Sequence, residues 1–174
     1  MGLKGDISMF KKIFGKREEV LKSIQLIAPV SGKMLTIEEV PDPVFSQKMM
    51  GDGVAFEPQE GKIVAPADGE IIQVFPTKHA IGIKAVNGAE ILIHIGLETV
   101  GMKGEGFTVN VSEGKKVKQG DVLVTVDLNL VKEKASSIVT PMIITNLNDM
   151  QSIEKSSLSS VIAGEQAVMT IEAK

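Results

Sequence analysis

Short apolar segments rich in valine and isoleucine recur from Ile24 to the end of the chain, and glycine, proline, asparagine and aspartate separate them. Apolar runs of this length between turn residues are typical of β-strands. The stretches 127–135 and 147–155 instead suit short helices. Many short strands joined by glycine-rich turns predict an all-β fold, an antiparallel β-sandwich or barrel with only short helices. Strands are expected at 24–28, 33–38, 53–57, 61–65, 69–75, 80–86, 89–95, 107–111, 122–127, 138–145 and 167–172.

One five-residue pattern occurs twice. Ala28-Pro29-Val30-Ser31-Gly32 is followed 37 residues later by Ala65-Pro66-Ala67-Asp68-Gly69, and in both places an isoleucine or valine precedes the pattern and an apolar strand follows it. The repeat predicts an internal duplication, with two related halves packed on each other. The alternative is that Ala-Pro-x-x-Gly is a favourable turn that the chain uses twice.

Residues 1–23 differ from the rest and are interpreted as an N-terminal tail ahead of one domain at 24–174. Lysine and arginine alternate there with apolar residues, at a spacing that fits one stripe of a helix. A basic amphipathic helix can lie on an anionic membrane surface, so weak membrane contact is one interpretation. A flexible tail is the other, because isolated helices this short are marginal in water. The apolar stripe consists of Ile7, Phe10, Ile13 and Phe14.

Composition narrows the choice of function. A chain of 174 residues, 43% of them apolar and 24% charged, has the size of one globular domain. Its formal net charge of −3 argues against nucleic acid as the main partner, because binding a phosphate backbone needs a basic surface. It has no cysteine, which excludes disulfides and thiolate chemistry. No apolar run approaches the ~18 residues of a membrane span and no signal peptide is apparent, so a cytoplasmic location is expected.

The two histidines of the chain, His79 and His94, flank a predicted hairpin. Asn87-Gly88 between two apolar runs indicates a two-residue type I′ turn. Such a turn would place His94 opposite Ile81, with His79, two residues earlier, on the same face of the sheet. The imidazoles would then be diagonal neighbours with backbones ~7–8 Å apart. Two histidines together on an apolar face favour a functional site over a structural role.

A neutral imidazole nitrogen is a competent nucleophile near pH 7, because its unperturbed pKa is about 6.5. It can attack phosphorus and hold a phosphoryl group reversibly. The second histidine could donate a hydrogen bond to the phosphoryl oxygens, where negative charge builds up. Thr77, predicted on the same strand face as His79, could orient that ring. An apolar rim would exclude water and offer a partner protein a docking surface, and no cofactor or metal is expected.

At these residues the chain resembles the glucose-family enzyme IIA domains of the bacterial phosphoenolpyruvate:sugar phosphotransferase system. Residues 88–100, which read Gly-Ala-Glu-Ile-Leu-Ile-His-Ile-Gly-Leu-Glu-Thr-Val, fit the family's phosphorylation-site pattern at all thirteen positions. Further family landmarks follow in order over nearly all of residues 24–174: Ile27-Ala28-Pro29, Val40-Pro41-Asp42, Gly51-Asp52-Gly53, Val64-Ala65-Pro66, Thr77-Lys78-His79-Ala80, Lys103-Gly104-Glu105-Gly106-Phe107 and Thr140-Pro141.

The resemblance implies a β-sandwich phosphocarrier, a phosphotransferase component with its active site in a shallow depression. His94 would be phosphorylated by the carrier protein HPr, His79 would stabilise the phosphoryl group, and Thr77 would orient His79. The phosphoryl group would pass to a cysteine of the IIB domain of a sugar permease. Neither the sugar nor the choice between a free-standing protein and part of a permease follows from these residues, and a monomer is expected.

The resemblance also implies a docking rim around the histidines, and this rim is expected to be aliphatic. The same surface could serve another function, that of a regulatory module that binds target proteins by contact alone. Phosphorylation would control such binding, because two negative charges would disrupt an apolar contact. The rim is expected to contain Ile81, Ile83, Leu92, Gly96 and Glu98.

Two alternatives share parts of the pattern. Gly114–Asp121 occurs in similar form in some zinc cell-wall peptidases, but a catalytic zinc usually has three protein ligands. The chain has two histidines and no His-x-His, so Glu98 would have to supply the third ligand. The same segment resembles a turn of biotinyl and lipoyl carrier domains. Those domains display a lysine at a hairpin tip, whereas the tip here is Asn87-Gly88.

Overall fold

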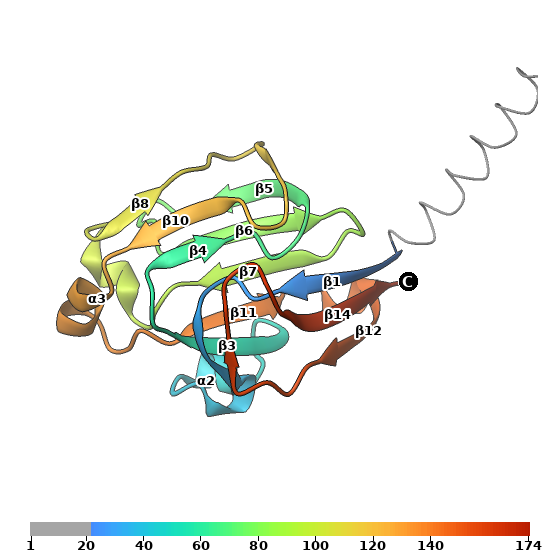
Figure 1. Cartoon of the computed structure of the whole chain (residues 1–174), viewed down its shortest axis with the longest axis horizontal. Helices are drawn as coiled ribbons and strands as arrows, with labels where there is room; N and C mark the ends of the chain where they lie inside the picture. Colours follow the sequence, from blue (N-terminus) through green and yellow to red (C-terminus); the bar gives the residue numbers. More distant parts are fainter. Residues whose placement is uncertain (1–21) are drawn as a thin grey trace, which may run out of the picture.

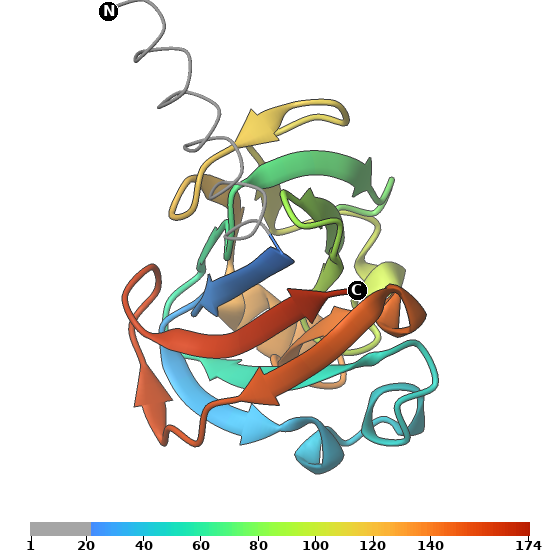
Figure 2. The same cartoon turned by 90° about the vertical axis from the view of Figure 1, so that its right-hand side faces the viewer.

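The computed structural model describes residues 22–174, and its strands pair in antiparallel fashion, as the sequence predicts. Figures 1 and 2 show them wrapped in layers around a common interior. The largest sheet contains eight strands and carries both histidine segments. Its order is β13 (Ser160–Val161), β2 (Gly32–Thr36), β3 (Asp52–Pro58), β11 (Thr140–Ile144), β7 (Glu90–His94), β6 (Ala80–Ala85), β5 (Gly69–Val74) and β9 (Lys116–Val117).

Two three-stranded sheets complete the sandwich. One has the order β1 (Ser23–Ile27), β14 (Ala167–Ala173) and β12 (Met150–Lys155), and the other β4 (Lys62–Val64), β10 (Val122–Val126) and β8 (Phe107–Val109). The helix expected at 147–155 is wrong, because this stretch pairs with β14 as a strand and only its first three residues turn helically. The predicted tail helix lies outside the described residues, and no helix within 22–174 is long and apolar enough to cross a membrane.

The helical segments of the described chain are short. The helix expected at 127–135 is confirmed as α3 (Leu128–Lys134), which begins where the Asp127 carboxylate accepts a hydrogen bond from the Leu130 amide. A second helix, α2 (Pro43–Ser46), begins in the same way at Asp42, with Pro43 at its first position. The 3₁₀ turns are η1 (Ile37–Glu39), η2 (Thr99–Met102) and η3 (Leu147–Asp149).

Two apolar clusters lie on opposite faces of the large sheet. Alternate residues of β7 divide between them: Ile91 and Ile93 join the main core inside the sandwich, whereas Leu92 joins a smaller cluster on the other face. This explains why β7 reads as a continuous apolar run, since both of its faces are buried. The smaller cluster supports the histidines and contains Leu35, Ile37, Val40, Phe45, Ala55, Ala80, Leu92, Leu97, Val139 and Ile143, with Phe75 packed against it.

The two Ala-Pro-x-x-Gly turns contact each other in the fold. The amide of Ile27 donates to the carbonyl of Pro66 (3.0 Å), and the amide of Val64, 37 residues after Ile27, donates to the carbonyl of Pro29 (2.8 Å). Each turn thus makes the same contact with the other, as two halves related by an approximate two-fold axis would. The reciprocal bonds favour an internal duplication over a turn that recurs by chance.

The β6–β7 hairpin has a different register from the one predicted. Ala80 pairs with His94 and Ile81 with Ile93, so the loop contains three residues, Val86 to Gly88, instead of two. Gly88 closes it in the left-handed conformation (φ +91°), as three-residue hairpin loops often do. The side-chain amide of Asn87 donates to main-chain carbonyls of Lys22 and Ile171, beside the ends of β1 and β14. A tertiary contact therefore holds the asparagine that the sequence assigned to a local two-residue turn.

Candidate functional site

The two imidazoles lie together at the end of the β6–β7 pair. Their ring centroids are 4.9 Å apart with planes at 76°. His94 is the last residue of β7, and His79 immediately precedes β6, in a turn where Lys78 is left-handed (φ +62°). Since His79 is outside the strand, the alternation of faces does not apply to its side chain. The predicted proximity of the histidines is therefore confirmed, although the register used to derive it was wrong.

A main-chain carbonyl fixes the tautomer of His94. Its Nδ1 lies 2.7 Å from the oxygen of Gly96. A carbonyl can only accept, so Nδ1 carries the proton and, in the neutral ring, Nε2 holds the free lone pair. Gly96 is left-handed (φ +73°), and a Cβ there would come within 2.6 Å of the Thr99 methyl. The hydroxyl of Thr99 donates to the Ile95 carbonyl at 2.7 Å and supports the same bend.

Thr77 contacts His79 as predicted, with its hydroxyl 2.6 Å from Nδ1, but both residues lie in the turn before β6 and not on a strand face. The main-chain carbonyl of His79 accepts a hydrogen bond from the Ile95 amide at 2.7 Å. Both the ring and the backbone of His79 are therefore held. Because a threonine hydroxyl can donate or accept, this contact is compatible with either tautomer of the ring.

Burial keeps both rings neutral. His79 is only 5% exposed, and burial, together with the nearby His94, lowers its pKa to about 4. Burial also lowers the pKa of His94, although the Gly96 carbonyl and the Asp42 carboxylate partly oppose this. A neutral imidazole is the nucleophilic form, so the lowered pKa of His94 keeps this ring nucleophilic to a lower pH than a free imidazole.

The lowered pKa of His79 predicts that the free energy of unfolding decreases as the pH is lowered. The unfolded histidine takes up a proton near pH 6.5, whereas the folded one does so near 4, so acid favours the unfolded chain between these values. This destabilisation is absent above about pH 7, and between pH 6.5 and about 4 it grows by up to about 1.4 kcal/mol for each pH unit. Urea unfolding at pH 7.5 and 5.0 measures it. The loss should be smaller in His79→Gln, and equal losses in both proteins would contradict the pKa assignment.

The histidines line an open depression of about 290 Å³. Of the expected rim, Leu92 and Glu98 line the depression, whereas Gly96 does not: it is buried and contacts His94 through its carbonyl. Ile81 and Ile83 are wrong as rim residues, because both are fully buried in the main core. The one-residue change in register moves them to the opposite face of the sheet. The depression is lined by Asp42, Val44, Phe45, Met50, Phe75, His79, Leu92, His94, Glu98, Thr99 and Val100.

Two aromatic side chains pack against the imidazoles, whereas the exposed edge of the depression is aliphatic, as the sequence predicts. The ring of Phe45 packs at 5.0 Å from His94, and that of Phe75 at 5.5 Å from His79. Val44, Met50 and Val100 add exposed apolar surface at the edge of the depression. Sequence reasoning missed these residues because they carry no reactive group. The available signal was the presence of large apolar side chains, such as Val44 and Phe45, in a segment outside the predicted strands.

The described residues also bear on the zinc alternative. Within residues 22–174, no three histidine or carboxylate side chains are grouped closely enough to hold a metal ion. Glu98 lines the depression with both histidines but does not complete such a group. The donor set that a catalytic zinc usually has is therefore not assembled in this part of the chain.

Comparison with known proteins agrees with this geometry. A family model described as the phosphoenolpyruvate-dependent sugar phosphotransferase system, EIIA 1, matches residues 24–150. The phosphotransferase-system glucose-specific EIIA component of Halalkalibacterium halodurans is 56% identical over 170 residues, which cover 94% of this chain and 98% of that protein. The corresponding protein of Bacillus cereus is 54% identical over 166 residues, covering 95% and 100%.

A solved structure shares the fold as well as the sequence. Glucose permease IIA from Mycoplasma capricolum superposes with a TM-score of 0.80 at 41% identity, covering 85% of this chain and 96% of that one. The match confirms the predicted antiparallel β-sandwich. With a family model that spans most of the domain and relatives more than half identical, the chain belongs to the EIIA 1 family of the phosphoenolpyruvate-dependent sugar phosphotransferase system.

Proposed function

We propose that the chain carries a phosphoryl group on Nε2 of His94, accepting it from phospho-HPr and passing it to a cysteine of a IIB domain during sugar uptake. One observation carries the proposal: the Gly96 carbonyl holds the proton of His94 on Nδ1, so that the Nε2 lone pair is free in an open depression beside a second imidazole. The names of the relatives make glucose the proposed sugar. The proposal takes the chain to act as a monomer in the cytoplasm.

The bonds exchanged in each step follow from this arrangement. In acceptance, the Nε2 lone pair bonds to phosphorus, and the phosphorus–nitrogen bond of the donor histidine breaks with its electron pair left on the donor. In delivery, a cysteine thiolate attacks phosphorus and the electron pair of the bond to His94 returns to Nε2. Negative charge builds on the phosphoryl oxygens in both steps. When Thr77 donates to Nδ1 of His79, Nε2 of that ring carries a proton that can stabilise this charge.

The surface of the depression favours a protein-bound phosphoryl donor. The carboxylates of Asp42 and Glu98 line it and would repel free phosphate, whereas they would attract cationic groups brought by a partner. The exposed apolar side chains of Val44 and Val100 offer the partner a docking contact. The same surface supports regulatory docking, because a phosphoryl group on His94 would place negative charge within the contact area.

Intact-mass spectrometry tests the proposal directly. The full chain is incubated with phosphoenolpyruvate, enzyme I and HPr, and its mass is compared with that of a sample lacking enzyme I. We expect one acid-labile gain of about 80 Da, the mass of one phosphoryl group in place of a proton. If a folded protein gains no mass while HPr itself becomes phosphorylated, the proposal fails and the depression is left as a docking surface only.

A further inference from the structure

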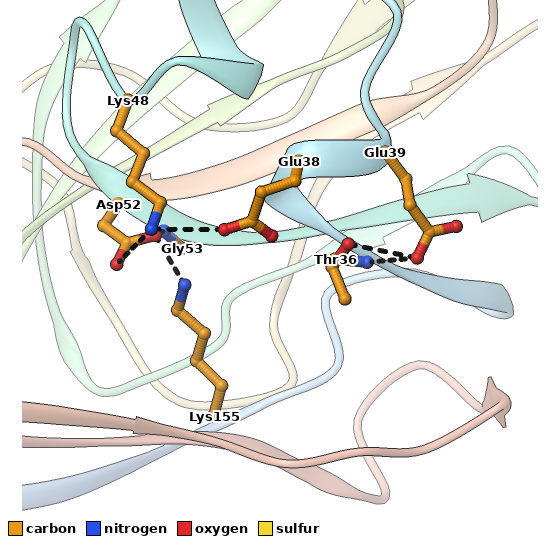
Figure 3. Close-up of polar contacts among 7 residues, drawn as sticks. All are labelled: Thr36, Glu38, Glu39, Lys48, Asp52, Gly53 and Lys155. Carbon is orange, nitrogen blue, oxygen red and sulfur yellow. Dashed lines mark hydrogen bonds and ion pairs between the residues drawn. The ribbon is translucent and has the colours of Figure 1, made fainter.

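Asp52 is the centre of a cluster of ion pairs that lies outside the histidine site (Figure 3). Its carboxylate accepts hydrogen bonds from Nζ of Lys155 on β12 and from the amide of Gly53 at 2.8 Å, and it forms a longer ion pair of 3.8 Å with Nζ of Lys48. Lys48 also contacts Oε1 of Glu38 at 3.1 Å. The Asp52 side chain is 19% exposed, so water screens its ion pairs less than those of a fully exposed carboxylate.

The cluster lies at one end of a segment that builds the histidine site. Residues 37–51, here called the site loop, connect β2 to β3 and contain η1 and α2. Four residues that line the depression come from this loop. One of them places its ring against His94, and two are exposed apolar side chains at the edge. They are Asp42, Val44, Phe45 and Met50.

The main chain of the site loop is bonded mostly to itself. The amides of residues 40, 42 and 45–49 all donate to carbonyls within 37–45. At its β2 end, Glu39 accepts hydrogen bonds from the amide and hydroxyl of Thr36, and elsewhere apolar side chains such as Val40 and Phe45 connect the loop to the smaller cluster. Apolar contacts are not directional, so they set the position of a self-bonded loop less sharply than polar ones. Lys48, bound to Asp52, adds a polar connection between the loop and β3.

We infer that Asp52 is a positioning residue: through Lys48 it holds the site loop so that Phe45 packs on His94 and the docking edge keeps its shape. Lys155 on β12 holds the Asp52 carboxylate in place, so these ion pairs connect the loop to both β3 and β12. Asp52 is not among the residues that line the depression. The inference rests on the proposed function only where it concerns partner binding, since the loop position can be measured in the free protein.

The test compares Lys48→Met, which removes the ion pairs of Lys48 with Asp52 and with Glu38, with Asp52→Asn, which removes the charge of residue 52 but keeps its shape. Asp52→Glu restores the charge and should recover most of the effect. Lys134→Met is the matched control, because it breaks an exposed ion pair of 2.9 Å with Glu105 outside the site loop. Lys48 is 43% exposed, so its substitution should leave the fold intact even if Asp52→Asn does not.

Two readouts separate positioning from general stability. In the free protein, the proton resonance of the His94 ring carbon between its nitrogens senses the Phe45 ring current. It should move toward its position in Phe45→Leu for both test variants, but not for Lys134→Met. With phospho-HPr as donor, KM should rise about five-fold while kcat changes less than about two-fold, because binding is lost and the histidines remain in place.

The outcomes distinguish this inference from the proposed function. If the resonance and KM of Lys48→Met and Asp52→Asn match those of the unmodified chain, the positioning role is overturned while phosphoryl transfer stands. An equal KM change in Lys134→Met would also overturn it, because the loss of a positive charge outside the site loop would then raise KM by the same amount. If no protein accepts phosphate, the proposed function fails, and the resonance alone still decides whether Asp52 positions the loop.

Discussion

Replacing His94 by glutamine should abolish phosphoryl acceptance, so that no mass gain is detected in the presence of phosphoenolpyruvate, enzyme I and HPr. Glutamine places a nitrogen within reach of the depression, but an amide nitrogen has no available lone pair to attack phosphorus. The loss should be complete, because the second imidazole is poorly placed to replace the first. His79 is 5% exposed, whereas His94 is half-buried at the end of β7. Intact mass, read with and without acid treatment, measures the result.

The matched control for this experiment is His79→Gln, which changes the neighbouring ring by the same substitution. It should still gain the phosphoryl group, which would show that loss in His94→Gln does not come from a disturbed depression. Thermal unfolding of both variants near that of the unmodified chain would exclude a global defect. A phosphoryl group found on His94→Gln would move the site assignment to another residue.

Replacing His79 by glutamine should slow delivery to the IIB cysteine by roughly 100-fold or more, the usual cost of losing one charge-stabilising donor. In acceptance, the donor protein's own site still holds the phosphoryl oxygens at the start of transfer. In delivery, they begin in the depression of this chain, where His79 is the nearest ring to His94 at 4.9 Å between centroids. Rapid-quench measurement of single-turnover transfer from the phosphorylated chain to a IIB domain gives the rate.

Thr77→Val provides a graded comparison for this prediction. It removes the hydroxyl 2.6 Å from Nδ1 of His79 but keeps the ring and the shape of the threonine. We expect an intermediate rate of delivery, because the ring remains but its tautomer and orientation are less restricted. Delivery by His79→Gln at the rate of the unmodified chain would remove His79 from the transfer step.

The local pattern predicted much of this site because its parts lie close in sequence. β6, β7 and the turn between them occupy fewer than twenty residues, and alternation with turn residues is enough to recognise such a hairpin. His79 and His94 therefore had to lie near each other at the open end of the hairpin. The contact between Thr77 and His79 could be predicted in the same way, because only two positions separate these residues in the sequence. The element missed most clearly is β12, whose own sequence is equally compatible with a short helix and which no short turn signal links to its partner β14.

The register of the hairpin required the tertiary structure. Asn87-Gly88 favours a two-residue turn in isolation, but Asn87 donates its amide hydrogens to Lys22 and Ile171, and the loop takes three residues. That one-residue change decides that Ile81 lies in the main core instead of beside His94. Bonds formed with segments more than sixty residues away decide this, and no local pattern contains them.

Short-range periodicity and chemical identity were enough to predict the all-β class, the proximity of the two histidines and the threonine beside one of them. Which side chains surround the rings depends on contacts between distant segments. Phe45 and Phe75 reach them from segments that no hairpin rule connects to His94, and a main-chain carbonyl fixes the reactive nitrogen. The physical reason is that packing across a sandwich joins residues by shape and burial, which a linear pattern of apolar and polar positions does not encode.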